Sequence, residues 1–288
     1  MFVELKYTLH RLRGQIIGWG IGIALYGLMM AAFYSDLAEM GGLINELLSS
    51  YPKELIAFFG DTIWNLNTPE GYLDLYYFNY MTVIIGIFSV GVGAKLLSGD
   101  EEHGIMDLVL SYPLSRTRFF WSRFFGFIIA TAAILIIGWL SWVIPSQNTG
   151  IPLTWMEFLL PFIPLFAELL VFASLALLLS MLLPSMRAAG WFSGCLLVAN
   201  YLLIGLSNIN ADLQSVIKYT PLYYYQGGDA ISGLNWEWLA GLLGVSIAFA
   251  LLAWWRFQQR DIRVGGEGGW ELTSVLGLLR LSSRSRKR

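Results

Sequence analysis

The stretch Gly-Gln-Ile-Ile-Gly-Trp-Gly-Ile-Gly-Ile-Ala-Leu-Tyr-Gly-Leu-Met-Met-Ala-Ala-Phe-Tyr, residues 14–34, contains no charged side chain. As a helix rising 1.5 Å per residue it is about 31 Å long, which matches a hydrocarbon core of about 30 Å. The stretch therefore predicts a membrane-spanning helix. The alternative is a cleaved signal peptide, with Lys6, Arg11 and Arg13 as its basic region. The apolar run is too long for that, and no clear cleavage site follows it.

Five further apolar runs have comparable length and are separated by short polar joints. Of the whole chain, 56% of the residues are hydrophobic and 13% are charged, about half the charged share of a soluble domain. We therefore predict an all-α membrane protein with six transmembrane helices. The other expected spans are about 75–97, 119–144, 158–183, 188–206 and 236–255.

The charge and cysteine content exclude two classes of protein. A net charge of −2 provides no global basic field for binding nucleic acid. A single cysteine, Cys195, cannot form a disulfide framework or a thiolate metal site.

The lysines and arginines predict the orientation of the chain. Six spans place both termini on one side, together with the joints at 95–118 and 184–188. Sixteen of the eighteen Lys and Arg residues then fall on that side, and only Lys53 and Lys218 fall on the other. By the positive-inside rule, both termini are expected in the cytoplasm of a multi-pass protein of the inner (plasma) membrane.

Three regions follow from this pattern. Residues 1–13 alternate apolar and basic side chains, which predicts an interfacial helix on the cytoplasmic face. Residues 14–263 form the six-helix domain, in which a re-entrant outside segment is expected at about 207–235, before the last span. Residues 264–288 form a basic cytoplasmic tail, which either contacts anionic lipid of the bilayer or is solvated.

The joint between the second and third spans carries the most information. Its sequence, residues 98–116, is Ser-Gly-Asp-Glu-Glu-His-Gly-Ile-Met-Asp-Leu-Val-Leu-Ser-Tyr-Pro-Leu-Ser-Arg. Ser98 or Asp100 can cap a helix and Pro113 can stop it, which predicts a cytoplasmic helix over about 98–115. Asp100, His103 and Asp107 share one face of that helix, so we expect an acidic surface for a partner.

Two polar side chains lie inside the expected spans. Glu168 lies near the middle of the fourth span, where an ionised carboxylate costs at least about 2.5 kcal/mol. It contacts either a translocation pathway or, as a protonated structural group, a neighbouring helix. Asn200 in the fifth span is a second candidate pathway contact, or forms a hydrogen bond between helices.

Motifs for catalysis, nucleotide binding and metal binding were not found in the sequence. There is no P-loop, no His-Glu-x-x-His and no cysteine pair, and the two histidines, His10 and His103, fall in cytoplasmic segments. We expect no catalytic residue, no metal and no bound cofactor, and therefore no enzyme. Any work that costs energy would then need a separate subunit that hydrolyses ATP.

Residues 101–116 resemble the signature Glu-x-Gly-Thr-(Glu/Asp)-Leu-Leu-Leu-Ser-x-Pro-(Ile/Leu)-Ser-Arg of ABC-2-type transporter permeases. The sequence departs from it at Ile105 and Met106. Residues 256–262, Arg-Phe-Gln-Gln-Arg-Asp-Ile, are similar to the family's Phe-x-Arg-Arg-Asp-Ile exit from the last helix, with Gln259 in place of the first arginine.

The resemblance implies the permease subunit of an ATP-driven exporter of a drug, antibiotic, lipid or polymer-like cargo. Two ATP-binding subunits would use ATP and Mg²⁺, and a second permease chain, identical or related, would complete the transporter. The joint would be the coupling helix that contacts the ATP-binding subunits, through Glu101, Glu102, His103, Gly104, Asp107, Pro113 and Arg116.

Two other functions remain as alternatives to export. One is a membrane scaffold or signal-relaying subunit driven by the same kind of ATPase. The other is a passive channel, which is disfavoured because no span carries a stripe of polar or charged residues that could form a ring.

Overall fold

Six long helices dominate the computed structural model of the chain. The structure describes residues 2–40, 47–48, 50–60, 66, 68–104, 106 and 115–260, and these contain no strand. The long helices are α1 (Phe2–Glu39), α5 (Asn79–Lys95), α8 (Arg116–Thr149), α10 (Phe162–Leu182), α11 (Met186–Ile209) and α13 (Trp236–Gln259).

Shorter helical elements join the long ones. α4 and the π-helix η2 run directly into α5, and α9 precedes α10, from which Leu160 and Pro161 separate it. The shorter elements are α3 (Lys53–Phe58), α4 (Pro69–Leu73), η2 (Asp74–Phe78), α6 (Ser98–Glu102), α9 (Trp155–Leu159), η3 (Ala211–Leu213), α12 (Gln214–Ile217), η4 (Pro221–Tyr224) and η5 (Gly227–Ser232).

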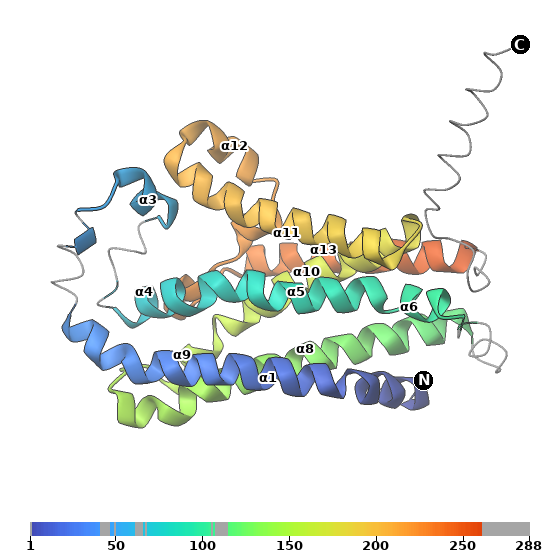
Figure 1. The fold of residues 1–288 in the computed structure, drawn as a ribbon, viewed down its shortest axis with the longest axis horizontal. Helices are drawn as coiled ribbons and strands as arrows, with labels where there is room; N and C mark the ends of the chain where they lie inside the picture. Colours follow the sequence, from blue (N-terminus) through green and yellow to red (C-terminus); the bar gives the residue numbers. More distant parts are fainter. Residues whose placement is uncertain are drawn as a thin grey trace, which may run out of the picture.

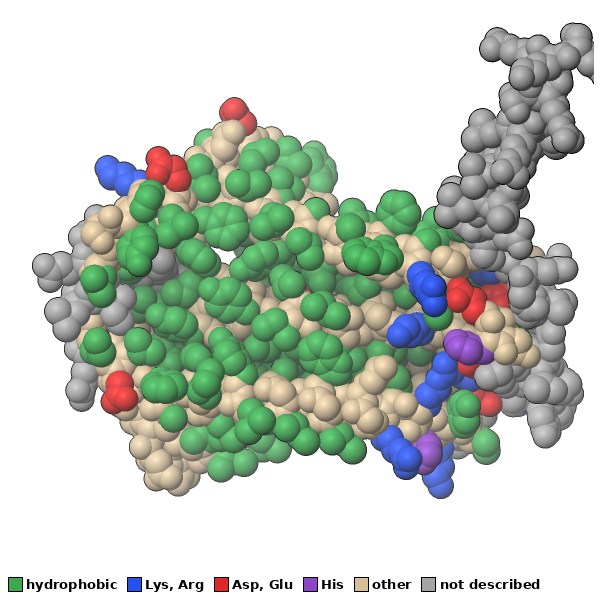
Figure 2. Space-filling model, in the orientation of Figure 1, with side chains coloured by type: hydrophobic (Ala, Val, Ile, Leu, Met, Phe, Trp, Pro, Cys, Tyr) green, Lys and Arg blue, Asp and Glu red, His purple; other side chains and the backbone are tan. Residues whose placement is uncertain are grey.

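The six long helices run side by side as one bundle (Figure 1). The N-terminus, α6 and the last turns of α10 and α13 lie at one end, which we call the α6 end. Elements α3, α4 and α12 lie at the opposite end. Lys and Arg side chains gather at the α6 end in Figure 2, and hydrophobic side chains cover much of the surface between the two ends.

Six helical segments are long and apolar enough to cross a membrane, and each overlaps one predicted span. The prediction of an all-α membrane protein with six such helices is therefore confirmed. The segments are Val3–Leu37, Pro69–Lys95, Arg116–Thr149, Trp155–Leu182, Met186–Ile209 and Trp236–Gln259.

Helix α1 continues through residue 13 without a break, and the division of the chain into regions at this residue stays a prediction. The first turns of α1 are held by α8, because Thr8 and Leu12 are buried and Thr8 packs against Gly126. Packing against a neighbouring helix stabilises these first turns, so α1 extends beyond the apolar run. The expected tail at 264–288 lies outside the described residues.

Helix α10 forms the centre of the bundle. It packs against α5 and α13 along its length and also contacts α11, whereas α1 and α8 pack mainly against each other. Most of its side chains are buried, including Glu168.

The segment between α11 and α13 folds back onto the bundle. The backbone N–H of Gly228 donates a hydrogen bond to Asp74 Oδ1 at 2.6 Å, and the Tyr225 hydroxyl donates to the Phe78 carbonyl at 3.2 Å. Gly227 has a φ of +53°, a conformation that favours glycine. This return agrees with a re-entrant segment, and its depth in a bilayer stays a prediction.

A close approach of α5 to α10 predicts a sharp contrast between two glycines. A Cβ on Gly93 would lie 2.3 Å from the Ala173 carbonyl oxygen, whereas a Cβ on Gly91 would meet nothing within 4 Å. We expect Gly93→Ala to lower the free energy of unfolding by about 1–3 kcal/mol, because the backbones must separate. Gly91→Ala should be neutral or slightly stabilising. Thermal unfolding in detergent measures both, and equal stability of the two variants would contradict this packing.

Candidate functional site

The candidate site is the joint that follows α5, because the family signature at residues 101–116 lies in it. The predicted helix over 98–115 is interrupted in the structure: α6 ends at Glu102, and Gly104 has a φ of +68°. This left-handed conformation ends a right-handed helix. Neither Ser98 nor Asp100 is the cap, since α6 begins after Leu97 without a side-chain cap. Asp107 and Pro113 lie outside the described residues.

Asp100 points into the bundle and is 3% exposed. Its two carboxylate oxygens pair with different arginines, Oδ1 with Arg11 of α1 and Oδ2 with Arg123 Nη2 of α8 at 2.6 Å. The contact with Arg123 is an ion pair without hydrogen-bond geometry. Arg123 is 1% exposed, and its Nε also lies 3.5 Å from Glu4 Oε2 of α1. Asp100 therefore links α6 to both α1 and α8.

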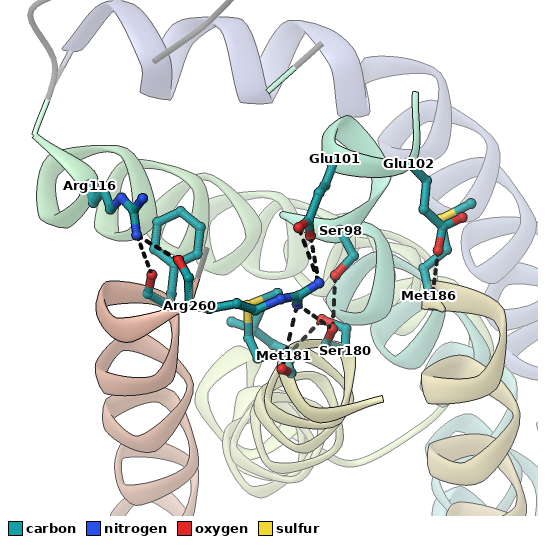
Figure 3. A network of polar contacts seen from close by, with 10 residues as sticks. Ser98, Glu101, Glu102, Arg116, Ser180, Met181, Met186 and Arg260 are labelled. Carbon is teal, nitrogen blue, oxygen red and sulfur yellow. Dashed lines mark hydrogen bonds and ion pairs between the residues drawn. The ribbon is translucent and has the colours of Figure 1, made fainter. Parts of the chain in front are cut away.

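Glu101 also turns inward, toward the ends of two other helices. Its carboxylate accepts from Arg260 Nη2 at 3.1 Å through Oε1, and Oε2 lies at 3.0 Å from the same nitrogen. Arg260 follows the last turn of α13, and its Nη1 lies 3.4 Å from the Ser180 carbonyl oxygen in α10. Ser98 Oγ donates to the same carbonyl at 3.1 Å (Figure 3).

Glu102 joins α6 to the start of α11. Its Oε1 accepts a hydrogen bond from the backbone N–H of Met186, the first residue of α11, at 2.6 Å (Figure 3). A carboxylate at a helix N-terminus satisfies an otherwise unpaired donor and interacts favourably with the helix dipole. Unlike Asp100 and Glu101, Glu102 is exposed, as is His103.

Arg116 binds the end of α13. Its Nη1 lies within hydrogen-bonding distance of the carbonyl oxygens of Phe257, Gln258 and Arg260, at 3.3, 3.2 and 2.8 Å (Figure 3). The last carbonyl groups of a helix lack partners within it, and a cation there satisfies them and complements the dipole. Arg116 therefore places the end of α13 beside the start of α8.

The acids of the joint were expected on a surface for a partner, but Asp100 and Glu101 are paired within the chain. Arg11, Arg123 and Arg260, whose pairing with these acids was not predicted from the sequence, are their partners. Arg123 carried a usable signal, because a charge eight residues into a helix that spans a membrane needs a partner.

Glu168 and Asn200, the candidate pathway contacts, are not joined by a hydrogen bond among the described residues. Glu168 is fully buried in α10, and neither carboxylate oxygen has a hydrogen-bond partner there. Asn200 Nδ2 donates to the Leu196 carbonyl of its own helix at 2.8 Å, so it is not seen to link two helices. A role for either residue in a pathway stays a prediction.

Comparison with protein families places the chain beside a known family. The model of a family described as ABC-2 family transporter protein matches residues 11–262, from the first helix to the end of the last. Comparison with curated proteins gives no match.

The burial of Asp100 predicts a larger stability effect than a surface charge would have. We expect Asp100→Asn to lower the free energy of unfolding by about 3 kcal/mol, because Arg123 loses its closest counter-charge in a buried place. Glu102→Gln removes a charge from an exposed position and should cost at most about 1 kcal/mol.

Thermal unfolding of the two purified variants in one detergent provides the comparison. A smaller loss for Asp100→Asn than for Glu102→Gln would show that Asp100 does not hold the joint.

Proposed function

The chain belongs to the ABC-2 transporter family and is a membrane permease of an ABC transporter, and from this premise we propose that it is the permease of an ATP-driven exporter. Membership of this family implies association with an ABC ATP-binding subunit. In our proposal that subunit acts on α6, and the helices linked to α6 change their arrangement in response.

The observation that carries the proposal is the set of contacts that the three consecutive acids of α6 make with other helices. Asp100 contacts α1 and α8, Glu101 contacts the arginine that ends α13 and lies against α10, and Glu102 contacts α11. Since α6 follows α5 along the chain, its displacement reaches all six spanning helices. A joint with exposed acids alone would transmit force only through the backbone.

The part of α6 that faces outward fits contact with a partner. Glu102 and His103 are exposed, and the turn at Gly104 follows them. Because Gly104 has no side chain, the backbone of a partner could approach closely there. Asp107 and Pro113 extend this proposed contact along the chain. Arg116 has a different role in the proposal, since it fixes the end of α13.

We further propose that two ATP-binding subunits and two permease chains, identical or related, form the transporter. The partner subunits would hold ATP and Mg²⁺. The Lys and Arg side chains at the α6 end support its placement on the cytoplasmic side of the inner (plasma) membrane. ATP is available on that side. The cargo would leave the cytoplasm and belongs to the range of drugs, antibiotics, lipids and polymer-like molecules.

The test compares Glu102, whose carboxylate accepts a hydrogen bond from the first residue of α11, with Glu237, which lies in the first turn of α13 at the opposite end of the bundle. The permease is reconstituted with its ATP-binding subunit, and ATP hydrolysis and transport are measured against a panel of cargoes. Glu102→Ala cuts the contact with α11 but leaves the buried pairs intact. We expect the amount of cargo moved per ATP hydrolysed to fall severalfold while the subunits stay associated.

Glu237→Ala is the matched control, because Glu237 lies in the first turn of α13, away from the α6 end, and is exposed. It should leave the transport-to-hydrolysis ratio unchanged. An unchanged ratio in Glu102→Ala would contradict transmission through α6. Hydrolysis that no cargo stimulates, without transport in the unmodified complex, would instead favour a scaffold or signal-relaying subunit.

A further inference from the structure

A small cavity lies between α1, α5 and α8 at the α6 end of the bundle. Its volume is about 160 Å³, and Leu12, Val92 and Leu96 form buried apolar parts of its wall. The helices leave this space because α5 packs mainly against α10, whereas α1 and α8 pack mainly against each other. A cavity of this volume holds several water molecules or one small anion.

Three cations line the cavity, one from each helix. Arg11 of α1 and Lys95, the last residue of α5, are exposed, whereas Arg123 of α8 is 1% exposed. A Cβ on Gly99 of α6 would lie 3.5 Å from Arg11 Nη2 and 3.7 Å from Lys95 Cβ. Arg11 and Lys95 therefore flank the same point of α6, and the cavity is reached from the surface.

The acids around the cavity do not balance these cations. Asp100 pairs with Arg11 and Arg123, and Glu4 pairs with Arg123, but neither acid lines the cavity. Lys95 forms no ion pair within the part of the chain that the structure describes. Two acids thus face three cations. Beside apolar walls the repulsion among the cations is weakly screened, so an anion in the cavity would be stabilised.

The guanidinium of Arg123 also needs acceptors. Its Nε and Nη2 are buried and have no hydrogen-bond partner among the described residues, because the contacts with Asp100 and Glu4 are ion pairs without hydrogen-bond geometry. Buried donors normally find an acceptor. A phosphate group presents several acceptor oxygens and matches the planar fork of a guanidinium. Water would supply acceptors but would leave the charge unbalanced.

We propose that this cavity binds a phosphate group, supplied either by free phosphate or by the headgroup of a membrane phospholipid. Its oxygens accept hydrogen bonds from Arg11 and Arg123, and its charge balances that of Lys95. Bound there, the phosphate connects the end of α5 to α1 and α8, beside the ion pairs of Asp100.

The charge test uses the full-length permease in detergent and has one arm for each source. Inorganic phosphate is titrated at constant ionic strength and followed by thermal unfolding, because a ligand of the folded state raises the unfolding temperature. Phosphatidylglycerol is titrated and followed by native mass spectrometry. In the arm in which the unmodified chain binds, Lys95→Gln should weaken binding about fivefold. Arg13→Gln is the matched control, because Arg13 is an exposed cation of α1 that does not line the cavity.

The filling test changes the space and leaves the charge unaltered. Gln15 lines the cavity from α1 and is exposed, so Gln15→Trp should obstruct it and weaken binding at least fivefold. Ile17→Trp is the control, because Ile17 is an exposed residue of α1 outside the cavity wall.

Binding that both Lys95→Gln and Gln15→Trp weaken supports the proposal, and the arm in which it occurs identifies the source of the phosphate. Absence of binding in both arms would overturn the proposal. Binding that either of these two variants leaves unchanged would overturn it as well, since the phosphate would then lie elsewhere on the protein.

Discussion

The burial of Asp100 between two arginines is the constraint on which the α6 end depends. A charged group removed from water requires a counter-charge close by, and a lost partner costs far more than a lost surface pair. Arg123 is almost completely buried on α8, so α6 must lie where Asp100 can reach it. Arg11 on the other side of the carboxylate then fixes α1. Three helices thus meet at one ion cluster.

The remaining acids of α6 extend this arrangement to the other half of the bundle. Glu101 reaches Arg260, whose guanidinium also lies close to the end of α10, and Glu102 reaches the first turn of α11. Both contacts lie at helix ends, and Glu102 accepts from a backbone N–H that has no partner within α11. A short helix with three acids can therefore connect many long helices. This is the physical basis for proposing that α6 passes motion from an ATP-binding subunit to the spans.

The spans could be predicted from the sequence because bilayer thickness sets their length and composition. Residues 14–34 and their five counterparts each overlap a helix of the right kind, and the signature at 101–116 identified the family that the match to residues 11–262 confirms. The direction in which the acids of α6 point could not be predicted. Helical spacing places Asp100 on one face, but its counter-charges come from Arg11 and Arg123, distant along the chain. The end of the helix before Gly104 could not be predicted either, because an isolated glycine within a helical pattern does not reveal its φ angle.

The central claim is that α6 moves as one unit with the ends of the helices to which it is linked. Spin labels on cysteines at His103, just after α6, and at Gln259, in the last turn of α13, measure this directly, since both positions are exposed. Cys195 is first replaced by serine. Pulsed electron paramagnetic resonance then gives the distance between the labels in the assembled transporter, without nucleotide and with ATP trapped. We predict the same distance distribution in both states. A distribution that shifts on ATP binding while transport continues would contradict transmission through the contacts of α6.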